Sequence, residues 1–198
     1  MRLFSIAVLL LAGMFSSAQA QLKDEALTPV FKALGEKQWE VAHKLANDIL
    51  LKHDTEQTNP VAFTRYIALY TGAAMVADGK LTYEQFTPYA QQFVGKALIM
   101  AAHPTTADTT VKLALNTTVL KRVNDVSTAY VACTNDTRDK IYSYELLKFA
   151  TDFDQTQYEG QKTRTAGYLE AIVLNPEKQT NWIMQLTLDK ATIHLWKN

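Results

Sequence analysis

The sequence has only one cysteine, Cys133, among its 198 residues, so no disulfide can form within the chain. Cys133 lies in the segment VSTAYVACT, between small and apolar neighbours, and this setting predicts a buried, unreactive thiol. A nucleophilic cysteine needs a nearby cation or base to lower its pKa, and the local sequence has neither. The cysteine content therefore predicts neither a disulfide framework nor a thiol nucleophile.

An excess of charge of one sign is also missing. The 20 Lys and Arg residues balance the 20 Asp and Glu residues, which gives a formal net charge of zero. A nucleic-acid-binding protein needs a basic face, so nucleic acid is not expected as a partner. The hydrophobic content of 47% is typical of a folded globular protein rather than a disordered chain.

The motifs of the common enzyme classes are absent. The sequence contains no P-loop, dinucleotide-binding fingerprint, nucleophile elbow, zinc-protease helix or Cys-x-x-Cys pair. After residue 20 the only serines are Ser127 and Ser143, and neither lies in a nucleophile motif. No histidine has a second histidine or a cysteine three or four positions away, so a zinc site is not expected. The sequence thus predicts no catalytic residue and no cofactor.

Only one long apolar run is present, and it lies at the start. Arg2 precedes the apolar segment Leu3–Phe15, and Ala18-Gln19-Ala20 supplies the small residues that signal peptidase requires. The run is shorter than the roughly 20 residues of a membrane-spanning helix, and no later segment approaches that length. We therefore expect residues 1–20 to be a signal peptide cleaved after Ala20, and the protein to be periplasmic or secreted.

Residues 21–104 have the pattern of helical hairpins. Apolar residues follow helical spacing in two segments, DEALTPVFKALGEK and KQWEVAHKLANDILLKHD. Asn59-Pro60 predicts the start of a third helix, which is apolar around most of its circumference and should be central and buried. Three aromatic residues of this helix are candidates for the lining of a ligand groove, although their helical spacing favours the core: Phe63, Tyr66 and Tyr70.

The segment AMVADGKLTYEQF looks like half of a calcium loop but lacks the ligands. Ala74, Val76 and Gln85 stand where such a loop has oxygen ligands. Gly79 instead predicts the left-handed end of one helix, and Thr82 with Gln85 predicts a capping box at the start of the next. We therefore expect a helix–turn–helix corner rather than a calcium site.

This corner repeats an earlier one, because Gly35 and Gly79 are 79 − 35 = 44 residues apart. With the pattern W-E-x-A after a glycine turn and a proline that closes each unit, residues 22–104 resemble tetratricopeptide-type repeats. The period exceeds the family's roughly 34 residues, two units are present where about three are usual, and Phe86 replaces a small alanine. The resemblance implies a non-enzymatic module that binds a protein or peptide. Two unrelated hairpins in one bundle fit these residues equally well.

After a composition break at HPTTADTT, residues 105–125 read as a connector, either helical or mixed. From residue 126 the apolar period becomes two. A hairpin is predicted where the turn NDTRDK separates VSTAYVACT from IYSYELLKF. A second hairpin is predicted where Asp189-Lys190 separates WIMQLTL from ATIHL. We expect residues 126–198 to form an antiparallel sheet, so the predicted fold class is α+β.

One acidic pair is a candidate metal site. Asp152 and Asp154, in the segment TDFDQTQYEG, alternate as calcium ligands do, and Glu159 is a third ligand candidate. The segment lacks the glycine that calcium loops use before their later ligands, so solvated carboxylates fit as well.

Two classes of function remain open. The first is a non-enzymatic scaffold of the cell envelope that binds another envelope protein or a peptide. The second is a small-molecule-binding protein or enzyme with its site between the helices and the sheet. A pocket with two or more convergent ionisable groups favours the second class, and a shallow apolar groove favours the first. The open side of the helices needs a cover, which could be a partner protein or one face of the sheet. We expect the sheet to cover it with Trp182, Met184, Leu186 and Leu188.

Overall fold

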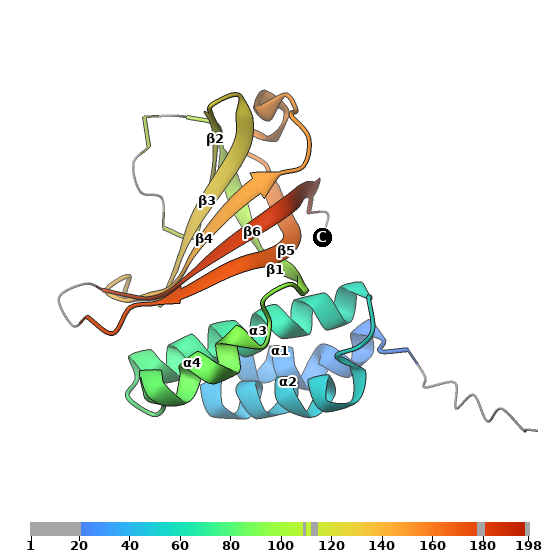
Figure 1. Ribbon diagram of the computed structural model, residues 1–198, viewed down its shortest axis with the longest axis vertical. Helices are drawn as coiled ribbons and strands as arrows, with labels where there is room; N and C mark the ends of the chain where they lie inside the picture. The colour runs from blue at the N-terminus through green and yellow to red at the C-terminus, as the bar shows by residue number, and fades with distance from the viewer. Residues whose placement is uncertain (1–20, 109, 112–114, 178–180, 197–198) are drawn as a thin grey trace, which may run out of the picture.

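The computed structural model describes residues 21–108, 110–111, 115–177 and 181–196, and places a layer of helices across one end of a barrel (Figure 1). A 3-10 helix at Asp24–Leu27 precedes the helices α1 (Thr28–Gly35), α2 (Trp39–His53), α3 (Asn59–Ala77) and α4 (Tyr83–Gln91). The strands are β1 (Ala97–Thr106), β2 (Thr118–Val123), β3 (Val126–Thr134), β4 (Ile141–Phe149), β5 (Lys162–Leu174) and β6 (Trp182–Leu195), with a second 3-10 helix at Gln155–Tyr158. The α+β class is confirmed; the signal peptide predicted at residues 1–20 lies outside the described residues.

Three helix ends lie where their local sequences predict them. Pro60 lies in the first turn of α3, where its missing N–H costs no hydrogen bond. Thr82 and Gln85 form the predicted capping box at the start of α4. Gly79 has a φ of +71°, the left-handed conformation that reverses the chain between the two helices. The calcium-like segment is therefore a helix–turn–helix corner.

Helix α3 is the centre of the molecule, as its apolar circumference predicts. Its buried residues extend from Val61 to Val76, and it contacts α2 and α4 as well as strands β1, β4 and β6. Helix α4 approaches closely because Gly72 has no side chain: a Cβ atom there would lie 2.3 Å from the Phe86 ring. This close approach explains the large residue at position 86. In the part of the chain that the structure describes, no helix is long and apolar enough to cross a membrane.

The strands form a closed barrel in the order β1-β2-β3-β4-β6-β5. Four of the neighbouring pairs are antiparallel, but β1 with β2 and β4 with β6 run parallel. The antiparallel sheet predicted for residues 126–198 is therefore wrong for the pair β4–β6, while β1 and β2 lie outside that range. The physical reason is that β4 and β5 run in opposite directions, so β6, which lies between them and is antiparallel to β5, must run parallel to β4.

The first two strands lie where the sequence predicts other structure. Strand β1 begins at Ala97, inside the predicted helical region, and β2 occupies Thr118–Val123 of the predicted connector. The segment ALIMAAHPTT is rich in good helix formers, so local preference alone favours a helix. Pairing with β5 overrides that preference, from Ala97 opposite Tyr168 onward.

The predicted turn at Asp189-Lys190 is also wrong, because β6 is one continuous strand. Lys190 has a φ of +51°, and the register with β5 shifts there, which is the geometry of a bulge. The bulge keeps apolar residues on the buried face on both sides of it: Met184, Leu186 and Leu188 before it, and Ala191 and Ile193 after it. The same apolar pattern therefore fits either a hairpin or a bulged strand. Pairing with the long strand β5 on both sides of the bulge favours the bulged strand.

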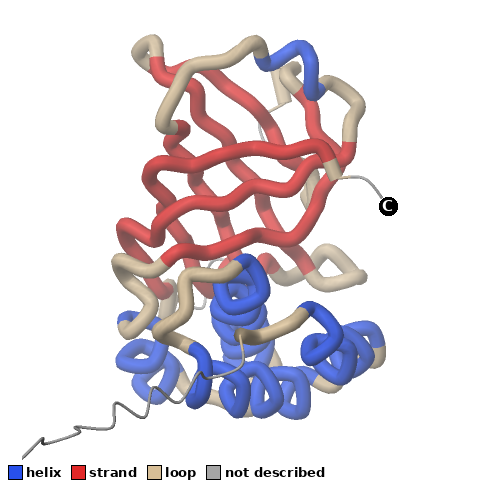
Figure 2. The backbone as a smooth tube through the Cα atoms, turned by 90° about the vertical axis from the view of Figure 1, so that its right-hand side faces the viewer, coloured by secondary structure: helices blue, strands red, loops and turns tan. Residues whose placement is uncertain are grey.

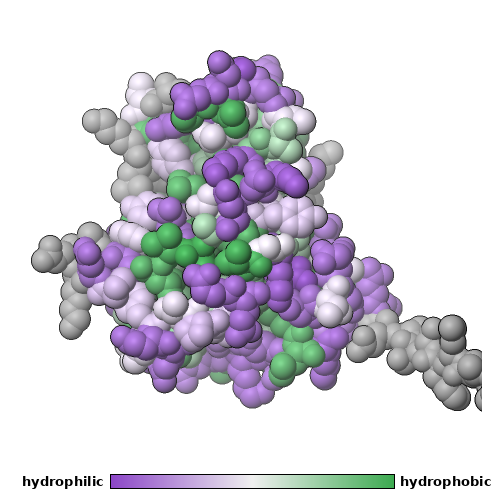
Figure 3. Space-filling view, in the orientation of Figure 1, coloured by the Kyte–Doolittle hydropathy of each residue, from purple (hydrophilic) through white to green (hydrophobic). Residues whose placement is uncertain are grey.

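The core has two parts. The larger part lies between α3 and the end of the barrel nearest the helices, and it includes Leu69, Met184, Leu186 and Leu188. This confirms the prediction that the sheet covers the helices. Trp182 is only partly buried. The smaller part fills the far end of the barrel: Leu120, Ala129, Leu147, Phe149, Ala191 and Ile193. Figure 2 shows the four α-helices gathered at one end of the strands, and Figure 3 shows apolar side chains on the surface where the two layers meet.

Candidate functional site

A cluster of polar side chains lies inside the barrel, at the end that α3 crosses. Glu145 is fully buried, and its Oε1 accepts hydrogen bonds from Tyr66 Oη at 2.8 Å and from Ser143 Oγ at 3.0 Å. Cys133 Sγ donates to the same oxygen at 3.2 Å, and His103 Nε2 lies 3.5 Å from that sulfur. These five residues are called the inner cluster.

The β3–β4 hairpin, which the sequence predicts, brings three members of the inner cluster together. Cys133 pairs with Ser143, and Val131 pairs with Glu145. Because side chains alternate along a strand, Cys133, Ser143 and Glu145 share the inner face. Tyr66 reaches them from α3, and His103 reaches them from β1.

The inner cluster shifts the ionisation of its members. Burial raises the pKa of Glu145, and the three donors to its oxygen oppose that effect. Burial and the nearby Glu145 carboxylate raise the pKa of Cys133 well above its usual value, so the sulfur stays protonated at neutral pH. The pKa of His103 is lowered to about 4, and burial is the main cause. The charge of Lys162 also lowers it, whereas a hydrogen bond with the Asn116 backbone acts in the opposite direction. The imidazole is therefore neutral at pH 7.

One oxygen of the inner cluster is left unsatisfied. Glu145 Oε2 is buried and has no hydrogen-bond partner among the described residues. No Lys, Arg or His in the described part of the chain forms a salt bridge with this carboxylate. A buried polar atom without a partner is costly, so its presence needs an explanation.

A cavity of about 260 Å³ opens onto the inner cluster from the junction of the helices and the barrel. Helices α1, α2 and α3 supply one wall, and β1, β3 and the segment before β2 supply the other. Its lining is mostly apolar and aromatic: Leu34, Trp39, Phe63, Tyr66, Ile67, Tyr70, Ala101, His103, Asn116 and Cys133. It is called the aromatic cavity.

The three aromatic candidates from the sequence lie together in the wall of this cavity. Tyr66 stacks near Phe63, with ring centroids 6.3 Å apart, and lies 5.9 Å from the ring of Tyr70. Tyr70 in turn packs edge-on against Trp39 at 6.3 Å. Tyr66 is also part of the core, so its ring belongs to the packing while its hydroxyl belongs to the inner cluster.

Among the described residues, the ligand atoms of Asp152, Asp154 and Glu159 do not converge as a group of three. Asp152 makes an ion pair with Arg122, with Nη2 and Oδ2 2.7 Å apart, and Asp154 accepts from the Thr156 N–H at 3.0 Å to cap the 3-10 helix. Glu159 accepts from backbone and side-chain groups of residues 106 and 107. Each carboxylate is thus used by the chain itself. Among the described residues, the group whose ligand atoms converge is a different one: His103, Cys133 and Glu145.

The sequence interpretation of Cys133 is confirmed in its burial but missed its neighbours. The hairpin that contains Cys133 and Glu145 was predicted, but its register was not, and the shift between Cys133 and Thr134 puts Cys133 and Glu145 on one face. No local signal could identify His103 as a neighbour, since its segment was predicted to be helical. The base that Cys133 lacks in its local sequence is thus supplied by a distant strand.

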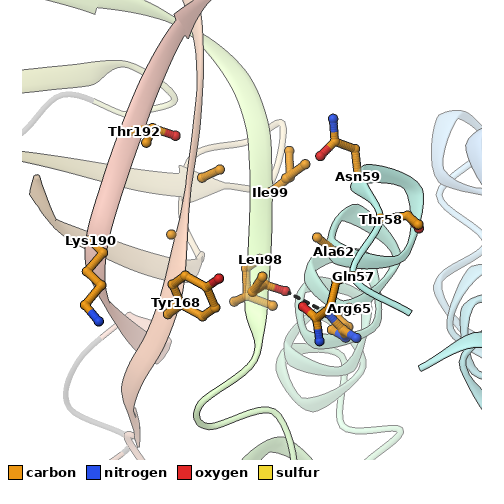
Figure 4. A pocket seen from close by; sticks show the side chains of 13 residues that line it. Gln57, Thr58, Asn59, Ala62, Arg65, Leu98, Ile99, Tyr168, Lys190 and Thr192 are labelled. Carbon is orange, nitrogen blue, oxygen red and sulfur yellow. Dashed lines mark hydrogen bonds between the residues drawn. The ribbon is translucent and has the colours of Figure 1, made fainter. Parts of the chain in front are cut away.

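Two other openings lie beside the aromatic cavity. The first, of about 240 Å³, lies between α3 and strands β1, β5 and β6 and is shown in Figure 4. Arg65 lines it, but its guanidinium is already hydrogen-bonded within the chain, because Nη1 donates to the Ala97 carbonyl at 3.2 Å. The second, of about 790 Å³, contains Arg164, whose guanidinium lies 4.8 Å from the Phe63 ring and 3.7 Å from the Trp196 ring. Neither gathers acids, bases and a thiol as the inner cluster does.

Comparison with protein-family models, with curated proteins and with solved structures finds no match to this chain.

Proposed function

We propose that this chain is an exported small-molecule-binding protein, whose ligand enters the aromatic cavity between the helices and the barrel. The observation that carries the proposal is the combination of aromatic walls with a polar inner end. Tyr66, His103 and Cys133 converge at that end, and the Glu145 carboxylate lies directly behind them. Ligand sites in proteins commonly have this composition, with mostly apolar walls and a few polar groups that fix orientation.

The size and charge of the cavity favour a small, uncharged ligand. A volume of about 260 Å³ is at the low end for ligand sites, so one or two rings fit and a peptide does not. In the metal-free protein, the buried carboxylate of Glu145 repels an anion. The neutral imidazole of His103 can accept a hydrogen bond from a hydroxyl or N–H group of the ligand. We therefore expect a planar, largely apolar molecule with one polar group.

Ligand-observed NMR with a panel of simple ring compounds tests the proposal. Indole and phenol serve as neutral probes, with benzoate and benzylammonium as anionic and cationic counterparts. We expect the neutral probes to bind, and Ala101→Leu, which fills the cavity, to weaken binding at least tenfold. Ala150→Leu is the matched control, because Ala150 is exposed and does not line the cavity. Equal binding by both variants, or no binding by any probe, would overturn the proposal.

A second candidate is the protein- or peptide-binding scaffold that the tetratricopeptide resemblance implies. The observation that favours it is the exposure of two separate apolar residues of α2, Leu51 at 84% and Val41 at 46%. Against it, much of the apolar helical surface packs on the barrel rather than facing solvent. An envelope-extract pull-down with wild type and Leu51→Glu distinguishes the two. A partner retained by wild type and lost by Leu51→Glu would favour the scaffold.

A further inference from the structure

The unsatisfied carboxylate oxygen of Glu145 points to a missing cation. Three hydroxyl or thiol groups already donate to Oε1, so the residue is arranged to be an anion, yet no described cationic side chain pairs with it. An unpaired buried carboxylate would normally be neutralised, and the protein instead surrounds it with donors. The two other potential ligands beside it, His103 Nε2 and Cys133 Sγ, are metal-binding atoms.

We propose that the inner cluster binds one Zn²⁺ ion through His103 Nε2, Cys133 Sγ and a carboxylate oxygen of Glu145. The fourth position of the metal faces the aromatic cavity. This inference goes beyond the proposed small-molecule function and does not depend on it, because metal binding is measured without any organic ligand.

The spacing of the ligand atoms fits a single ion. The three atoms lie within 4.8 Å of one another, with 3.5 Å between His103 Nε2 and Cys133 Sγ and 3.2 Å between Cys133 Sγ and Glu145 Oε1. Around a tetrahedral zinc with bonds of about 2.0–2.3 Å, neighbouring ligand atoms are separated by roughly 3.3–3.6 Å. Two of the three separations are therefore close to those of a tetrahedral zinc site, and the third, between His103 Nε2 and the Glu145 carboxylate, is at most 4.8 Å.

Two of the three ligands, Glu145 and His103, are hydrogen-bonded by neighbouring groups that are not themselves ligands. Tyr66 and Ser143 donate to Glu145 Oε1, and the His103 ring hydrogen-bonds to the Asn116 backbone. In known metal sites such bonds orient the carboxylate and the imidazole and set their basicity. These contacts join the site to α3, β4 and the segment before β2.

Cys133 and His103 are a poor pair of nucleophile and base. A cysteine nucleophile acts as a thiolate, but the Glu145 carboxylate beside Cys133 opposes a second negative charge. A divalent cation removes this conflict. As it binds, the Cys133 thiol releases its proton to solvent, and the thiolate and the carboxylate share the positive charge.

The donor set selects the metal. One thiolate, one imidazole and one carboxylate form a mixed sulfur, nitrogen and oxygen site that suits Zn²⁺, with three protein ligands and one open position. Calcium and magnesium prefer oxygen donors only, so they are not expected to bind. Copper(I) also favours thiolate, and it is the competitor that the experiment must separate from zinc.

Titration of the metal-free protein with Co²⁺ as an optical probe tests the proposal. We expect one equivalent to produce the visible bands of a tetrahedral site and a sulfur-to-cobalt charge-transfer band, both displaced by Zn²⁺. Cys133→Ser should abolish the charge-transfer band, and Glu145→Gln and His103→Ala should each weaken binding by about tenfold or more. His194→Ala and Asp152→Asn are controls of matched chemistry outside the cluster and should bind as wild type.

A second measurement on wild type avoids dependence on variants that fail to fold. Because Cys133 is the only cysteine, its rate of labelling by a thiol reagent in mild denaturant reports on this site alone. We expect one equivalent of Zn²⁺ to slow labelling at least tenfold, and Ca²⁺ to have no effect. Zn²⁺ binding that survives both Cys133→Ser and Glu145→Gln, or labelling unchanged by Zn²⁺, would overturn the proposal. Protection by Cu⁺ without protection by Zn²⁺ would overturn the choice of zinc.

Discussion

Tyr66 on α3 donates a hydrogen bond of 2.8 Å to Glu145 on β4, a residue 79 positions later in the chain. This bond connects the central helix to the interior of the barrel, and both partners are buried. The aromatic ring of Tyr66 meanwhile packs in the main core and lines the aromatic cavity. One side chain thus links the two layers of the fold, the cavity and the inner cluster.

The first prediction concerns this hydrogen bond. Tyr66→Phe removes a donor to a buried carboxylate and keeps the ring, so we expect the free energy of unfolding to fall by about 1.5–3 kcal/mol. Urea unfolding of the metal-free protein measures the change. Tyr168→Phe is the matched control, because Tyr168 is 49% exposed and should change stability by less than about 0.5 kcal/mol. Equal losses in the two variants would show that the bond contributes nothing.

The second prediction concerns Arg65, which ties the helices to the first strand. Its side chain is 1% exposed, and its Nε donates to Asp54 Oδ1 at 2.7 Å. Arg65→Met leaves Asp54 and nearby carbonyls short of donors, so we expect a loss of about 3 kcal/mol in urea unfolding. Lys148→Gln breaks an exposed ion pair with Glu170 and should cost no more than about 1 kcal/mol. The prediction is wrong if the first variant costs as little as the second.

The third prediction concerns pH and Asp54. Burial by itself raises the pKa of Asp54, but hydrogen bonds from Lys96 and Arg65 outweigh burial and hold it below its usual range. A carboxyl with a lowered pKa stabilises the fold fully above its unfolded pKa of about 3.9, and this stabilisation is lost as pH falls through the folded pKa. Below about pH 4 the wild type should therefore lose stability more steeply than Asp54→Asn. Parallel stability curves from urea unfolding across this range would contradict the assignment.

The fourth prediction concerns the contact between α3 and α4. Gly72→Ala places a Cβ atom 2.3 Å from the Phe86 ring, so we expect a loss of about 1–3 kcal/mol from overpacking. Adding Phe86→Leu should recover part of that loss. Gly35→Ala meets no atom within 4 Å and should stabilise the protein by about 0.5–1 kcal/mol. Thermal and urea unfolding of the three variants measure these effects, and a neutral Gly72→Ala would refute the close contact.

The fifth prediction concerns export. If residues 1–20 are a signal peptide, protein recovered from the host envelope should begin at Gln21. Intact mass spectrometry measures this directly, including cyclisation of Gln21 to pyroglutamate. A retained Met1 or a lipid adduct would contradict cleavage after Ala20.

Sequence alone determined the elements whose chemistry is local. Pro60 in a first turn, the capping box of Thr82 and Gln85, and the left-handed Gly79 each act within a few residues. A short turn between two apolar segments was likewise enough to predict the β3–β4 hairpin. In these cases the stabilising hydrogen bonds are made inside the segment, so the pattern contains the information.

Tertiary structure decided the elements whose partners are distant. The segment that begins at Ala97 has helix-forming residues, and it becomes a strand because β5 offers an edge for pairing. The turn expected at Lys190 becomes a bulge because a 13-residue β5 pairs along most of β6. Local preference is worth less than about 1 kcal/mol per residue, so pairing and burial override it.

The site shows the same division. Sequence pattern identified Phe63, Tyr66 and Tyr70 as neighbours on one helix, and it predicted the hairpin that contains Cys133 and Glu145 but not the register that puts them on one face. Only barrel closure brings His103 to Cys133, and only the crossing of α3 brings the Tyr66 hydroxyl to Glu145. Neither contact has a local signature, because each depends on burial shared by elements that lie at least 30 residues apart in the chain.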